Sequence, residues 1–184
     1  MSATGLALAV IFSDLPILNV ASTVTLAAGV KVAITPHQPV CWVSLTPAGL
    51  PAHPPQARPF PAVIDTGFNH NFLLRSRQFR ARTGYELTLD DFPIFDRLRT
   101  YGRRADLHEA DLWLHPNVPG HRDQISRRPP IRLEMNLGVA VSPLADQPRL
   151  PLLGMLSIRE NGLQLLIDGA QGRMSLRTDS SWVP

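Results

Sequence analysis

The chain has 184 residues and a mass of 20.3 kDa, which suits one domain with a buried core and excludes two large domains. Hydrophobic residues make up 44% and charged residues 18%, a balance that excludes an intrinsically disordered chain. Its one cysteine, Cys41, excludes an internal disulfide and a cysteine-based metal cluster. The 18 prolines argue against long helices, because a proline inside a helix removes a hydrogen-bond donor. We therefore expect a mostly β protein of short strands, turns and loops.

The net charge of +3 is concentrated between residues 75 and 104. This stretch holds eight arginines and four carboxylates, a balance of +4, so the rest of the chain sums to −1. One interpretation is a nucleic-acid-binding module that holds phosphates by point charges. Few aromatic residues interleave with the arginines, and no helix-turn-helix or RNA-binding signature appears. We therefore favour a solvated basic surface and expect nucleic acid to be an unlikely partner.

The hydrophobic pattern indicates strands in the first part of the chain, and no segment of the sequence is apolar over the length of a membrane span. Residues 1–36 favour an N-terminal β appendage or edge hairpin with Gly29 at a turn, and residues 37–184 form the main domain. No apolar run reaches the roughly 20 residues that cross a bilayer. The short apolar run at residues 5–12 lacks the positive flank of a signal peptide. We expect a cytoplasmic protein without a membrane partner.

The remaining elements follow from hydrophobic period and turn residues. Apolar runs predict strands at residues 40–45 and 62–65, on either side of a proline-rich loop. A short helical turn is expected within residues 72–82, a loop or edge strand at 85–95, two strands turning near Gly102 within 97–114, and one continuous strand over 131–141. A short helix at residues 154–161, closed by Gly162, then precedes a hairpin over 163–176.

Two segments carry the chemical signal. The first is Ala-Val-Ile followed by Asp65, Thr66 and Gly67, an apolar strand that delivers a carboxylate into a tight turn. The second, about ninety residues later, is Leu152-Leu153-Gly154 at the start of the predicted helix. An Asp-Thr-Gly triplet alone is a weak signal, because all three residues are ordinary turn formers, whereas the pair of segments is much more specific.

Together the two segments resemble the retropepsin-like aspartic proteases, and single-domain bacterial members with an Asp-Thr-Gly-Phe loop look closest. The resemblance implies a closed β-barrel, one lobe per chain, with a short helix after the Leu-Leu-Gly element. It implies that Asp65 is catalytic, that Thr66 and Gly67 support the catalytic loop, and that Leu152, Leu153 and Gly154 pack behind it. Phe68 and Asn69 would then lie beside the substrate, and Tyr101 and Gly102 fall where the family places its flap.

The resemblance also implies the oligomeric state. Aspartic proteolysis uses two carboxylates that share one proton, and this chain supplies one such motif. A second copy of the chain must bring the other Asp65, so we expect a homodimeric endopeptidase that cleaves peptides or proteins without a metal or an organic cofactor. Asp168 also follows an apolar strand, but it lacks the hydroxyl residue and is better explained by an Asp-Gly turn.

Two departures from the retroviral pattern keep an alternative open. Asn69 and Met155 stand where the retroviral enzymes have a paired acid and arginine, and Phe68 replaces the usual alanine beside the substrate. A ring at residue 68 could narrow the cleft. The alternative is a catalytically inactive module of the same fold that binds peptides or dimerises.

Overall fold

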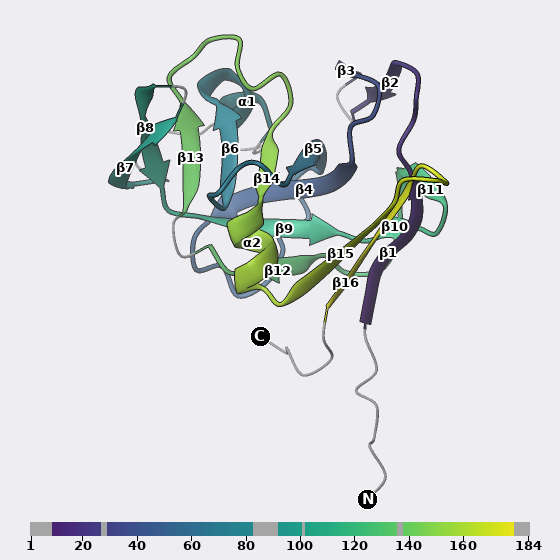
Figure 1. The fold of residues 1–184 in the computed structure, drawn as a ribbon. Helices are drawn as coiled ribbons and strands as arrows, with labels where there is room; N and C mark the ends of the chain where they lie inside the picture. Colours follow the sequence, from purple (N-terminus) through teal and green to yellow (C-terminus); the bar gives the residue numbers. More distant parts are fainter. Residues whose placement is uncertain (1–8, 27–28, 83–91, 101, 136–137, 179–184) are drawn as a thin grey trace, which may run out of the picture.

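The computed structural model describes residues 9–26, 29–82, 92–100, 102–135 and 138–178, and these residues are mostly β (Figure 1). The elements are β1 (Ala9–Pro16), β2 (Ser22–Thr25), β3 (Lys31–Ile34), β4 (Val40–Pro47), β5 (Phe60–Asp65), β6 (Phe72–Arg75), α1 (Ser76–Arg82), β7 (Ile94–Thr100), β8 (Arg103–His108), β9 (Ala110–His115), β10 (Asn117–Val118), β11 (His121–Ile125), β12 (Ile131–Leu133), β13 (Val139–Ser142), β14 (Leu152–Gly154), α2 (Met155–Glu160), β15 (Leu163–Asp168) and β16 (Arg173–Thr178). Among these residues, no helix is long and apolar enough to cross a membrane.

Nine strands form the main sheet, in the order β12-β9-β4-β5-β14-β6-β13-β8-β7. Its two end strands, β12 and β7, do not pair with each other, so the described residues form an open sheet and the expected closed barrel is wrong. β12 has only three residues and β7 is largely exposed, which leaves neither strand suited to closing the sheet against the other.

The centre of this sheet contains two parallel pairs. β14 lies between β5, to which it is parallel, and β6, to which it is antiparallel. β13 runs parallel to β6 on its other side. The chain must therefore pass over the end of β14 on its way from β5 to β6, and this crossing positions the candidate site.

The main hydrophobic core covers one face of the sheet. Side chains alternate along β5, so Ala62 and Ile64 enter this core while Val63 joins a second cluster on the opposite face. Asp65 is the last residue of β5 and lies two positions after Val63, so its side chain points to the same face as Val63, opposite the main core.

The N-terminal segment is integrated into this packing. β1 pairs with β16 in a three-stranded sheet, and Ile11, Phe12 and Leu15 are buried in the main core. β2 and β3 form a separate hairpin, which turns at Gly29 with a φ of +73°. Figure 1 shows this hairpin on the opposite side of the molecule from the β7–β8 hairpin.

Several local predictions are confirmed, one is wrong, and the helical turn expected within residues 72–82 is present over only part of that range. The helix after Gly154, the β15–β16 hairpin and a turn at Gly102 are present. The continuous strand over residues 131–141 is instead two short strands, β12 and β13, because Gly138 has a φ of +63° and its N–H closes a turn onto the Met135 carbonyl. Residues 72–75 are strand β6, and helix starts only at Ser76. The prediction for residues 85–95 lies mostly outside the described residues.

Candidate active site

Asp65 is half-buried at the end of β5, where the strand gives way to a tight turn. Its Oδ1 accepts a hydrogen bond from the Gly67 N–H at 2.9 Å, and its carbonyl accepts one from the Phe68 N–H at 3.2 Å. Asp65 forms no ion pair with any of the described residues. The turn therefore fixes the direction of a carboxylate that stays accessible to solvent.

The turn that follows Asp65 crosses directly over Gly154. The Gly154 N–H donates to the Asn71 carbonyl at 2.9 Å, and the Met155 N–H donates to the Phe68 carbonyl at 2.9 Å. A Cβ at residue 154 would collide with the His70 carbonyl and lie 2.7 Å from the Phe68 carbonyl. Only glycine lets the two backbones approach this closely, which explains why the Leu-Leu-Gly element ends in that residue.

A buried polar bridge, which the sequence analysis missed, holds the same turn to α2. Ser157 Oγ donates to the Asn71 carbonyl at 3.0 Å, and Asn71 Nδ2 donates to Glu160 Oε2 at 3.0 Å. Asn71 and Ser157 are fully buried. Asn69 and Met155, where the retroviral pattern has its charged pair, are not part of this bridge. Asn71 thus joins the turn to one hydroxyl and one carboxylate of α2, and no arginine takes part in this contact. The spacing of Ser157 and Glu160 along α2 is the only sequence signal that could have indicated it.

A small apolar cluster includes residues of both the Asp65 turn and the Leu-Leu-Gly element. Phe68 and Leu152 are half-buried and pack with Leu98 of β7 against a small cluster made of Leu73, Leu107 and Ala140. The Phe68 ring also lies 5.4 Å from the His70 ring, measured between centroids. Phe68 therefore rests on the sheet face and on the hairpin, three residues after Asp65 in the same turn.

The other predicted site residues lie as follows. Thr66 and Asn69 are exposed in the turn, Leu153 is buried behind it, and Gly102 forms the tip between β7 and β8 with a φ of +72°. Tyr101 lies outside the described residues. The hairpin that contains Gly102 meets the site through Leu98 and Leu107, so the turn after Asp65, the Leu-Leu-Gly element and the β7–β8 hairpin come together in one region.

A second polar cluster, also missed from the sequence, lies under the proline-rich loop. The fully buried Ser44 hydroxyl contacts His53 Nε2 at 2.8 Å and His115 Nε2 at 2.9 Å. Burial, and to a smaller extent the neighbouring His53, lowers the pKa of His115 to about 4. Burial also lowers the pKa of His53. A serine hydroxyl can donate to one neutral imidazole and accept from the other, so this cluster joins the loop to β4 and β9.

Comparison with protein-family models, with curated proteins and with solved structures finds no match to this chain. Within the described residues, no group of three or more His, Cys, Asp or Glu side chains is arranged to hold a metal ion.

Proposed function

We propose that the protein is a cytoplasmic aspartic endopeptidase that acts as a homodimer, with the catalytic water held between two Asp65 carboxylates. The observation that carries the proposal is the Asp65 turn itself. The Gly67 N–H orients the Asp65 carboxylate at the end of the strand, in a loop that crosses over Gly154. This carboxylate forms no ion pair within the described part of the chain. The retropepsin-like interpretation of the two sequence segments requires these two segments to meet in this manner.

The chemistry needs one proton shared by two carboxylates. One carboxylate removes a proton from water as the oxygen attacks the peptide carbonyl, and the protonated carboxyl donates a hydrogen bond to that carbonyl oxygen. The amide nitrogen then takes a proton and leaves as an amine. Each chain supplies one carboxylate. Thr66 is exposed, and Phe68 and Leu152 are half-buried, so these side chains can contact the partner copy or a bound peptide.

Asp65→Asn tests the assignment, with Asp168→Asn as the matched control. Asparagine keeps the shape of the side chain but cannot accept a proton from water, so the Asp65 variant should lose cleavage of casein or a peptide library while its thermal unfolding stays close to that of the wild type. Asp168 sits in the β15–β16 turn and accepts the Gln171 N–H at 3.0 Å, so its variant should keep full activity. Wild-type cleavage by the Asp65 variant would overturn the assignment.

The oligomeric state gives an independent test. Sedimentation at micromolar concentration should give about twice 20.3 kDa, and a monomer alone would exclude the shared-carboxylate mechanism. Activity should lie on the acidic side and be small at pH 8, because the pair works only while it retains one proton. A dimer that binds peptides but cleaves none at any pH would identify the catalytically inactive module instead.

A further inference from the structure

A second feature of the surface lies away from Asp65, beside the β2–β3 hairpin. A cavity of about 510 Å³ opens between this hairpin, the start of α1 and the loop before β14. Its lining residues are Val30, Lys31, Val32, Ala33, Arg75, Arg77, Gln78 and Arg149. None of them belongs to the Asp65 turn. The cavity and the turn lie at opposite ends of β14, since Arg149 precedes this strand and Gly154 ends it.

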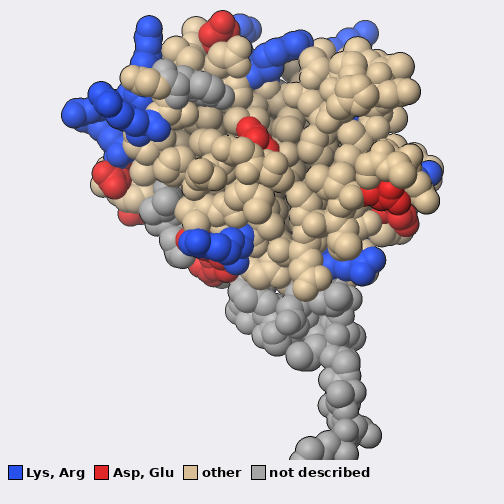
Figure 2. Space-filling view, in the orientation of Figure 1, with Lys and Arg blue, Asp and Glu red and all other residues tan. Residues whose placement is uncertain are grey.

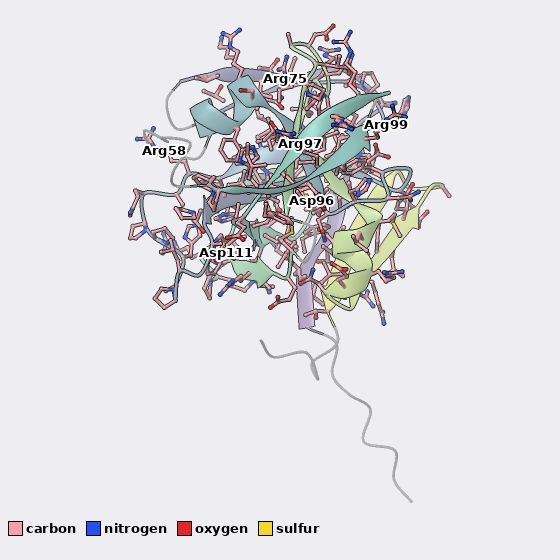
Figure 3. All side chains as sticks on the ribbon, turned by 90° about the vertical axis from the view of Figure 1, so that its left-hand side faces the viewer. Arg58, Arg75, Asp96, Arg97, Arg99 and Asp111 are labelled. Carbon is pink, nitrogen blue, oxygen red and sulfur yellow. The ribbon has the colours of Figure 1, made fainter. Side chains whose placement is uncertain are left out.

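The charge of this cavity is one-sided. Four of its lining residues are cations and no described carboxylate lines it. Lys31, Arg75, Arg77 and Arg149 also form no ion pair with the described residues, whereas Arg97 on β7 is paired with Asp106 at 2.9 Å. Figure 3 shows Arg75 well above Arg97 and Arg99, which lie along β7. The arginine-rich stretch of the sequence is therefore divided between two parts of the surface. Arg75 and Arg77 line the cavity, and Arg97 and Arg99 lie on β7.

Hydrogen bonds fix the frame that carries these cations. Gln78 is buried, and its amide oxygen accepts the Arg75 N–H at 2.9 Å while its amide nitrogen donates to the Arg149 carbonyl at 2.7 Å. Arg75 Nη1 donates to the Ala145 carbonyl at 3.1 Å. Arg75 Nε is buried and has no hydrogen-bond partner among the described residues. These hydrogen bonds tie the backbone of Arg75 to that of Arg149 through Gln78, so two of the lining cations start from a fixed backbone.

The remaining wall is apolar. Val32 is buried against the cluster that includes Trp42 and Leu150, while Val30 is 54% exposed at the tip of the hairpin. Figure 2 shows blue side chains gathered along the upper edge of the molecule, above α1 and the β2–β3 hairpin, with one red group among them. The cavity is thus lined by four cations and by the aliphatic side chains of Val30 and Val32, with Lys31 between the two valines on the hairpin.

We propose that this cavity binds a small organic phosphate, with the phosphoryl group on the four cations and the organic part against Val30 and Val32. Four cations without a carboxylate favour a dianion over a single carboxylate, and arginine donates to phosphate oxygens in bidentate fashion. The volume lies within the roughly 300–1,000 Å³ of small-molecule sites. A neighbouring cavity of about 710 Å³ shares Arg75 and Arg77, but Lys31 and Arg149 line only the first.

Titration calorimetry with phenyl phosphate tests the proposal on three proteins. The wild type should bind, and the double variant Lys31→Gln/Arg149→Gln should lose at least about tenfold in affinity, since it removes two charge-assisted contacts. Neither side chain makes a hydrogen bond within the described residues, so the fold should be unaffected. The matched control is Arg103→Gln/Arg104→Gln, which removes the same charge from the β7–β8 hairpin and should bind as the wild type does.

Each other outcome overturns the proposal. No heat with phenyl phosphate refutes the site. Equal affinity for inorganic phosphate refutes the role of the apolar wall. Equal weakening by both double variants shows a diffuse basic surface, and in that case a DNA duplex should bind all three proteins with a steep salt dependence and lose affinity equally in both variants.

Discussion

His115 should make the fold less stable as the solution becomes acidic. In the unfolded chain a histidine has its ordinary pKa of about 6.5, whereas burial lowers the pKa of His115 in the folded protein to about 4. Between these two values the unfolded chain binds more protons than the folded one, so the free energy of unfolding falls as the pH falls from 6.5 to 4. Above pH 6.5 this contribution to stability is fully present, and below pH 4 it has been lost.

The shift in the pKa of His115 sets the size of the effect. One pKa unit corresponds to about 1.4 kcal/mol, so a shift from 6.5 to about 4 gives at most about 3.5 kcal/mol for this residue. His115 is 6% exposed, so solvent screening reduces the figure little. A loss of that size should lower the melting temperature of a chain of this length by about 7–14 °C. His53, whose pKa burial also lowers, acts in the same direction.

Urea unfolding at pH 7.5, 6, 5 and 4 measures the effect, with His115→Gln as the variant. A glutamine amide can still contact the Ser44 hydroxyl but does not titrate, so the variant should lose less stability than the wild type across this range. The exposed His121→Gln is the matched control and should follow the wild type. If wild type and His115→Gln lose stability in parallel, the proposed coupling is wrong. If the proposed peptidase activity is present, acid unfolding of this kind would limit it on the low-pH side.

Three further changes test the packing. Gly154→Ala should destabilise the protein by about 3 kcal/mol or more, because its Cβ collides with backbone, whereas Gly169→Ala, with nothing within 4 Å, should have little effect on urea unfolding. Phe12→Ala should cost about 3–5 kcal/mol in the same assay, since the ring is fully buried; a change below about 1 kcal/mol would mean that β1 is a dispensable appendage. Burial raises the pKa of Cys41 to about 12, so iodoacetamide at pH 8 should label it only after urea unfolding, and rapid labelling of the native protein would contradict its burial.

The sequence analysis predicted correctly those elements that are determined by residues close together in the chain. The strand that delivers Asp65, the helix after Gly154 and the Asp-Gly hairpin each depend on neighbouring residues, and each is present. The alternation over residues 131–141 was misleading because a period of two does not register a turn, and Gly138 turns the chain in the middle of the pattern.

Long-range partners escaped the sequence analysis for a different reason. Ser44, His53 and His115 meet only because β4 pairs with β9 and the proline-rich loop folds over both strands. No spacing along the chain encodes that meeting. The contact between Asn71 and Ser157 likewise requires β14 to lie between β5 and β6. The pairing of Asp65 with Gly154 was anticipated through the family resemblance, and not through any local signal.

The position of β14 also determines when the candidate site can exist during synthesis. Asp65 and Gly154 are paired across 89 residues (154 minus 65), so the turn after Asp65 has no backbone to cross until residue 154 has left the ribosome. Until then β5 and β6 each face an unfilled place in the sheet, with unpaired N–H and C=O groups that can pair with other chains. The Asp65 turn is therefore incomplete in the nascent chain until β14 has been synthesised. During this period the unpaired edges of β5 and β6 also make the chain prone to aggregation.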